Sequence, residues 1–87
     1  MAIKSGQVAV GTTPTMIDGL HQMPYRITFQ NIDNTDAVFV GGPDVTINNG
    51  YRLEKLNAIQ LVINPLDALY AVSGKTGHSV CWIRETL

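Results

Sequence analysis

The sequence contains very little that could cross-link the chain, anchor it in a membrane or charge its surface. Its 87 residues include one cysteine, Cys81, so an internal disulfide is impossible and no cysteine pair can hold zinc. Charged residues make up only 15% of the chain, and six Lys and Arg nearly balance seven Asp and Glu. The basic residues are scattered singly, which argues against a nucleic-acid partner. The longest uncharged run, Ser5–Ile17, has 13 mostly polar residues, too few to span a membrane.

The length of the chain allows one domain, because domains usually hold roughly 100–150 residues. No apolar stretch follows Met1, so we expect no signal peptide and synthesis in the cytoplasm. Residues 1–6 precede the first predicted strand, and we expect them to form an N-terminal arm. Residues 7–87 then form a single compact β-domain.

The composition favours strands over helices. Val, Ile and Thr occur eight times each, so 24 of the 87 residues are β-branched. Turn-forming clusters recur every 8–12 residues, a spacing typical of sandwiches and barrels. We therefore predict an all-β fold, a small antiparallel β-sandwich or flattened barrel of about six to eight short strands. The predicted strands are Gln7–Val10, Tyr25–Asn31, Ala37–Val40, Tyr51–Leu53, Ala58–Ile63, Leu69–Ser73 and Ser79–Arg84, with a short bridge at Thr46 and Ile47.

Alternation of apolar and polar residues is clearest in Tyr25–Asn31. There Tyr25, Ile27 and Phe29 share one face, as expected of a half-buried antiparallel strand. The residues predicted to form the core are Tyr25, Ile27, Phe29, Val38, Val40, Ile59, Leu61 and Leu69.

Three strands have apolar residues on both faces, namely Ala58–Ile63, Leu69–Ser73 and Ser79–Arg84. A two-layer sandwich covers only one face of each sheet, and the sequence predicts no helix to cover the other. Either the strands roll into a tight barrel or a partner covers the second face. We favour the partner, because exposed apolar patches usually mark interfaces.

No residue pattern points to catalysis, a cofactor or a tight metal site, so we expect a non-enzymatic protein. Cys81 lies in an apolar strand, where it is expected to be a buried core thiol. His21 and His78 each lie in a turn and are expected to be solvated. The cluster Asn31–Asp36 has oxygen ligands that suit a cation, but Asx residues also build turns, and a hairpin turn is the preferred interpretation.

Several phrases in the sequence resemble a known kind of protein. Their order is similar to that of short β-rich capsid decoration (cement) proteins encoded among the head genes of tailed bacteriophages. The resemblance spans roughly Gln7 to Arg84, and its motifs are turns and strands rather than chemical groups. The phrases are Val10–Thr15, Arg26–Asn31, Val38–Val45, Asn49–Leu53 and Leu69–Ser73.

This resemblance implies a β-sandwich that coats the outer capsid surface as a homo-oligomer, with the major capsid protein and copies of itself as partners. It implies no catalysis, no cofactor, no nucleic acid and no membrane. Two alternatives stay open: another virion component, such as a tail or head–tail connector protein, and a small carbohydrate-binding module. The candidate interface residues are Tyr51, Tyr70, Val72, Trp82, Ile3 and Lys4.

Overall fold

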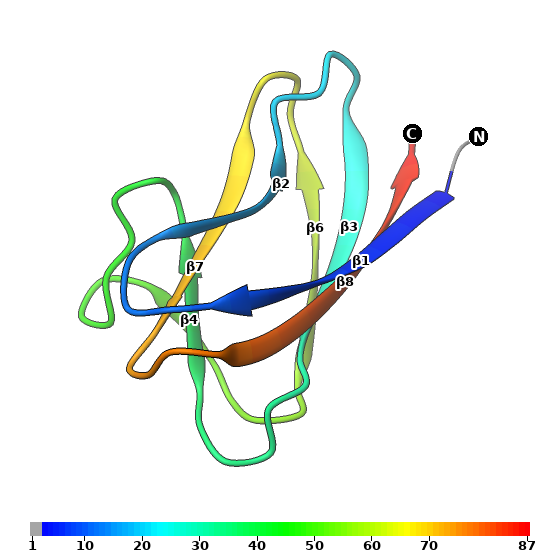
Figure 1. The fold of residues 1–87 in the computed structure, drawn as a ribbon. Coiled ribbons are helices and arrows are strands. Elements are labelled where there is room, and N and C mark those ends of the chain that lie inside the picture. The colour runs from blue at the N-terminus through cyan, green and yellow to red at the C-terminus, as the bar shows by residue number, and fades with distance from the viewer. Residues whose placement is uncertain (1–2) are drawn as a thin grey trace.

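The computed structural model of the protein describes residues 3–87, which form eight strands and no helix (Figure 1). The strands are β1 (Ile3–Val10), β2 (Thr15–Gly19), β3 (Tyr25–Asn31), β4 (Val38–Gly41), β5 (Tyr51–Leu53), β6 (Ala58–Ile63), β7 (Ala68–Ser73) and β8 (His78–Thr86).

The strands form two four-stranded sheets. Sheet A has the order β1-β8-β3-β6, and sheet B has the order β2-β7-β4-β5. All neighbouring strands are antiparallel. This order, in which strands far apart in the sequence become neighbours, is that of a jelly roll, a double-sheet β-sandwich. The predicted all-β sandwich is confirmed.

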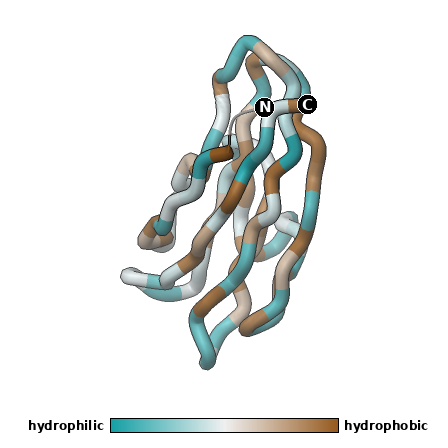
Figure 2. Tube along the Cα trace, turned by 90° about the vertical axis from the view of Figure 1, so that its right-hand side faces the viewer, coloured by the Kyte–Doolittle hydropathy of each residue, from teal (hydrophilic) through white to brown (hydrophobic). Residues whose placement is uncertain are grey.

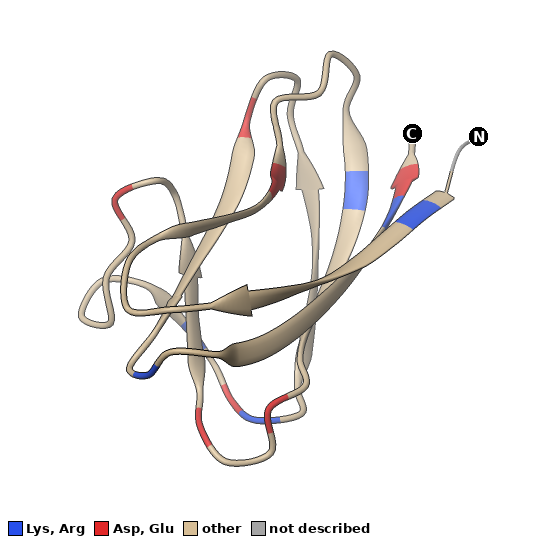
Figure 3. Cartoon of the chain, viewed as in Figure 1, with Lys and Arg blue, Asp and Glu red and all other residues tan. Residues whose placement is uncertain are grey.

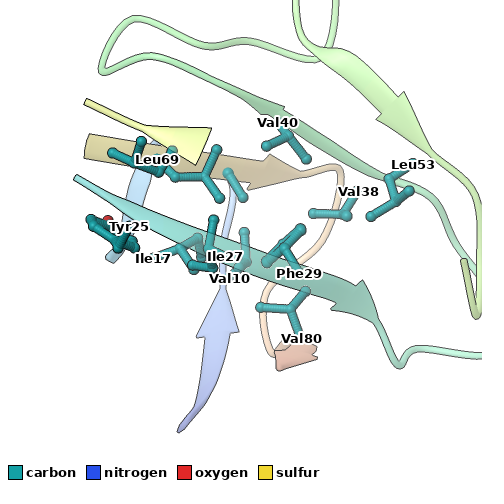
Figure 4. Close-up of a cluster of buried hydrophobic side chains, with 12 residues drawn as sticks. Val10, Ile17, Tyr25, Ile27, Phe29, Val38, Val40, Leu53, Leu69 and Val80 are labelled. Atoms are coloured by element: carbon teal, nitrogen blue, oxygen red, sulfur yellow. The ribbon is translucent and has the colours of Figure 1, made fainter. Parts of the chain in front are cut away.

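The core lies between the two sheets, where side chains from both point toward one another (Figure 4). Along β3 every second residue is buried, and Ile27 and Phe29 are fully enclosed. Figure 2 shows the corresponding alternation of hydrophobic and hydrophilic residues along the strands. Six of the predicted core residues are buried as expected, namely Tyr25, Ile27, Phe29, Val38, Val40 and Leu69.

Two predicted core residues, both in β6, are less buried than the other six. Ile59 is half-buried against the core, whereas Leu61 is 38% exposed, so its assignment to the core was wrong. The reason is that β6 is the last strand of sheet A and pairs only with β3. At this edge Leu61 therefore reaches the rim of the sandwich, whereas Ile63 of the same strand is buried in the core.

The N-terminal segment differs from its prediction as an arm. Residues 3–6 are part of β1, which pairs with β8 along its whole length from Ile3 to Val10. Met1 and Ala2, the rest of the predicted arm, lie outside the described residues. The strand was predicted too short because Lys4, Ser5 and Gly6 are poor strand formers by composition, and their pairing with β8 overrides that preference.

The loop between β4 and β5 covers part of sheet B. Thr46 and Ile47, predicted to form a bridge, lie in a turn in which the Asn49 side chain accepts a hydrogen bond from the Thr46 backbone N–H at 2.7 Å. Val45 is buried against Gly41 and Gly50. The outward face of β7 is therefore partly covered by the protein's own loop. In β6 and β8, by contrast, the outward-facing Val62 and Ile83 are 54% and 49% exposed.

Candidate functional site

A buried network of polar side chains joins the two sheets. His78 is fully buried; its Nδ1 lies 2.9 Å from Ser73 Oγ, and its Nε2 lies 2.8 Å from Asn31 Oδ1. Asn31 Nδ2 in turn donates to the backbone oxygens of Asp36 and Leu53, at 2.9 and 3.1 Å. Because Asn31 Oδ1 can only accept, His78 carries its proton on Nε2 and accepts from the serine at Nδ1.

The expectation that His78 is a solvated turn residue was wrong. The side chain follows Gly77 but faces inward in register with Val10, and burial lowers the pKa of its imidazole. The network has the residue types of a nucleophilic triad, with a serine, a base and an orienting amide. However, Ser73 is 1% exposed, and its hydroxyl already bonds His78 and the Lys75 backbone N–H. The arrangement satisfies buried polar groups and leaves no room for a substrate at the serine.

An ion cluster occupies the segment Asn31–Asp36, which was predicted to be a turn and considered as a cation site. Asp33 accepts hydrogen bonds from the backbone N–H groups of Thr35 and Asp36, which makes the segment a turn. The Lys75 ammonium lies 2.7 Å from Asp33 Oδ2 and 3.2 Å from Asp36 Oδ2. Hydrogen bonds from Lys75 and Thr35 lower the pKa of Asp33, and those carboxylates raise the pKa of Lys75. The positive charge between the carboxylates thus comes from the chain itself.

A second ion cluster lies beside the β2–β3 loop. Arg84 Nη1 is 2.7 Å from both carboxylate oxygens of Asp18, and His21 Nε2 is 3.1 Å from Asp18 Oδ1. Burial would raise the pKa of Asp18, but the hydrogen bonds from Arg84 and His21 outweigh it and lower that pKa. The buried Tyr25 hydroxyl has no hydrogen-bond partner, and burial together with the Asp18 charge raises the pKa of Tyr25 to about 12. The Arg84 guanidinium also lies over the Tyr25 ring. These contacts connect the β2–β3 loop to β8 and stabilise its position.

The predicted interface residues do not lie on one surface. Ile3 and Lys4 are exposed at the start of β1, and Tyr51 is 64% exposed on β5 of the other sheet. Tyr70 is half-buried on the outward face of β7. Val72 is buried, in a hollow that it shares with loop residues such as Val45, so it is not available to a partner.

Trp82 is half-buried and faces the interior of the sandwich. A Cβ atom on Gly6 would come within 2.9 Å of the Trp82 ring, so the ring lies directly over this glycine of β1. The Arg84 guanidinium is 5.4 Å from the ring centroid. Cys81, the residue before it, faces outward and is half-buried, so the prediction of a core thiol was wrong.

An apolar groove runs beside the free edge of β6. It has a volume of about 480 Å³ and opens where sheet A and sheet B separate. No charged residue lines it, and Figure 3 shows β6 free of charge. Tyr51 and Leu61 form its exposed rim. From the sequence, Tyr51 was predicted to lie in an interface and Leu61 in the core. We call this feature the β6 groove; it is lined by Val40, Gly41, Tyr51, Ile59, Gln60, Leu61 and Leu69.

A second apolar surface lies at the end of the molecule shown at the top of Figure 1, where the β2–β3 loop meets the β6–β7 turn. Two backbone hydrogen bonds join these loops, from Leu20 N to Asp67 O and from Leu66 N to His21 O. Leu20, Met23 and Leu66 are each at least 60% exposed there. We call these three side chains the apolar end. The sequence did not predict them as a surface, because they lie in turns, where side chains follow no regular spacing.

Two leucines of the apolar end have a strained backbone. Leu20 and Leu66 have φ values of 63° and 64°, in the left-handed region. Leu66 is the third residue of a turn closed by the Asp67 N–H on Asn64 O, a position where glycine or asparagine is usual. A left-handed conformation costs a non-glycine residue roughly 1–2 kcal/mol, and these exposed side chains gain little burial in return.

Neither a cluster of metal-ligating side chains nor a membrane-spanning helix occurs among the described residues. Among residues 3–87 no three His, Cys, Asp or Glu side chains come together in a way that could hold a metal ion. That part of the chain also contains no helix long and apolar enough to cross a membrane.

Comparison with known proteins identifies the fold but no family. No family model matches the chain, and no curated protein sequence matches it. One solved structure is similar: a chain from Bacillus endospore appendages, described as a novel family of disulfide-linked pili. The two share 14% sequence identity with a TM-score of 0.59, over 99% of this chain and 86% of that chain. At this identity the likeness concerns the sandwich fold alone.

Proposed function

We propose that the protein is a non-enzymatic structural protein of a phage virion, made in the host cytoplasm, that coats the exterior of the capsid. Its partners are the major capsid protein and copies of itself. The resemblance of its turns and strands to capsid decoration proteins supports this proposal, and the placement of its exposed apolar side chains gives it a physical basis.

The observation that carries the proposal is the apolar end. Leu20, Met23 and Leu66 present large apolar side chains on two hydrogen-bonded loops, at one end of the molecule. Residues 20–24 and 64–66 contain no Lys, Arg, Asp or Glu, and the exposed Asp67 that ends the second turn is charged. Exposed apolar patches of this kind mark protein interfaces, because removing apolar surface from water on binding a partner is favourable in free energy. This end is therefore the surface that we assign to the capsid.

The polar clusters fit a structural role better than a chemical one. The groups of the His78 network bond to amides and hydroxyls, and the charged groups of the other two clusters are held in ion pairs within the protein. A carbohydrate-binding module is less well supported, because Tyr51 and Trp82 belong to different sheets and do not form one aromatic platform.

The experiment is co-sedimentation with capsid shells assembled from the major capsid protein encoded nearest to this gene. Wild-type protein should sediment with the shells. The double variant Leu20→Asn, Leu66→Asn should bind at least about tenfold more weakly, because asparagine tolerates the left-handed backbone but removes the apolar contact.

Leu56→Asn is the matched control. Leu56 has the same left-handed backbone, with a φ of 63°, and is 55% exposed, but it lies in the turn before β6 at the opposite end of that strand. This variant should bind like the wild type. The proposal fails if the wild type stays in the supernatant, or if the double variant binds as tightly as Leu56→Asn.

A further inference from the structure

The free edge of β6 lacks the features that prevent edge strands from pairing with other chains. Natural edges are protected by shortness, charge, proline or bulges. β6 has six residues with no charge, proline, glycine or register shift. The other three edge strands each carry a protecting feature: β1 contains Lys4 and Gly6, β2 is interrupted by a bulge between Met16 and Asp18, and β5 has only three residues. Thus β6 is the edge of the described sheets that is best suited to pair with another strand.

The side chains around this edge suit a second copy of the same chain. The β6 groove lies beside the edge and has no charged lining residue, so two identical grooves can face one another without repulsion between like charges. Leu61, 38% exposed at the rim, and Tyr51, 64% exposed, would be covered by the same approach. A charged partner surface could form no ion pair with the residues that line the β6 groove.

The alternation of β6 also permits pairing with itself. Ile59, Leu61 and Ile63 face the interior, whereas Ala58, Gln60 and Val62 face outward. Around a two-fold axis perpendicular to the sheet, two antiparallel β6 strands keep inward residues opposite inward residues. In the two registers that pair the most residues of β6, either Leu61 or Gln60 faces its counterpart in the second copy. In both registers the inward-facing residues that meet are apolar and lie over the groove. When Gln60 faces its counterpart, two amides also pair on the outer face.

We propose that two copies of the protein pair antiparallel through β6, so that two A sheets become one continuous eight-stranded sheet across a two-fold axis. The pairing closes the β6 groove and removes the open edge. The inference rests on the proposed association of the protein with copies of itself, and it does not require the capsid or the apolar end.

The test combines sedimentation velocity with hydrogen exchange on the purified full chain, from about 1 µM to about 500 µM. We expect a monomer–dimer equilibrium and no larger species. Amide exchange in the peptide containing 58–63 should slow as dimer forms, because strand pairing occupies N–H groups that the isolated edge exposes to solvent. Exchange in β1 should not change with concentration.

Leu61→Lys is the disrupting variant, because an inward-pointing lysine is one of the ways in which natural edges are protected. It should raise the dimer dissociation constant at least about tenfold. The control is Ile83→Lys, which places the same charge on an exposed outward position of β8, two strands away from the edge. That variant should dimerise like the wild type.

Three results would overturn the inference. One is a wild type that stays monomeric at the highest concentration. Another is a series of larger oligomers with slowed exchange in both β1 and β6, which would mean head-to-tail pairing. The third is a dimer in which amide exchange of residues 58–63 is not slowed. This result needs only the wild-type protein, so it can be obtained even if Leu61→Lys fails to fold. Capsid binding is measured separately, so its failure would not be confused with these.

Discussion

Replacing Asn31 by alanine tests whether the buried polar network holds the two sheets together. The Asn31 side chain makes four hydrogen bonds: it donates to the backbone oxygens of Asp36 and Leu53, and accepts from Asp33 N and His78 Nε2. At about 1 kcal/mol per hydrogen bond, their loss costs about 4 kcal/mol. The fully buried His78 Nε2 would lose its acceptor, which adds to the cost because a buried donor without a partner is unfavourable.

That loss is large compared with the total stability expected of the chain. At roughly 0.05–0.15 kcal/mol per residue, a domain of this size has a free energy of unfolding of about 4–13 kcal/mol. Asn31→Ala should therefore be largely unfolded or lose a third or more of its stability. Ser73→Ala removes one hydroxyl with two hydrogen bonds and should lose about 1–3 kcal/mol.

The assay is urea unfolding followed by far-UV circular dichroism and by the fluorescence of Trp82. Asn34→Ala is the control, since Asn34 is exposed in the same loop and its replacement should change stability by no more than about 0.5 kcal/mol. If Asn31→Ala loses less than about 1 kcal/mol, the network does not stabilise the fold and the reasoning is wrong.

Three further predictions concern pH, metal and packing. Because burial lowers the pKa of His78 in the folded protein, the neutral imidazole stabilises the fold above about pH 6.5, and urea midpoints should fall as the pH is lowered from 6.5 toward 5, a slope that His78→Gln should abolish. A strong chelator should leave the melting temperature unchanged, because Lys75 already neutralises the carboxylates of its loop; a fall of about ten degrees or more would indicate a bound cation. Gly19→Ala should destabilise the fold by more than about 2 kcal/mol in thermal unfolding, because the added Cβ would overlap the Ala68 side chain and backbone; an unchanged melting temperature would contradict the close packing of β2 on β7.

The strands predicted best are those with turn residues on both sides. The bounds of β3, β5 and β6 are as predicted, because turn residues flank each one and the alternation within β3 is regular. β2 was not predicted. The bulge between Met16 and Asp18 breaks its alternation, so the pattern carries no period of two.

The candidate surfaces were harder to predict than the strands. The spacing of an apolar residue in a strand predicts that it lies in the core. Leu61 is nevertheless exposed, because β6 is an edge strand. The order of strands depends on the whole fold and cannot be taken from the spacing within one strand. His78 follows a glycine turn, and only its pairing with Val10 of β1 shows that it faces inward. Leu20 and Leu66 are far apart in sequence, and the two loop hydrogen bonds bring them together.

Cryo-electron microscopy of capsid shells incubated with the purified protein shows whether the protein binds the exterior of the capsid. We expect extra density on the outer surface of the shell, shaped as a small two-sheet sandwich, with residues 19–24 and 64–67 directed toward the major capsid protein. Shells without added density would contradict the proposed function. Density attached through the opposite end, at the turn containing Leu56, would contradict the assignment of the apolar end to the capsid.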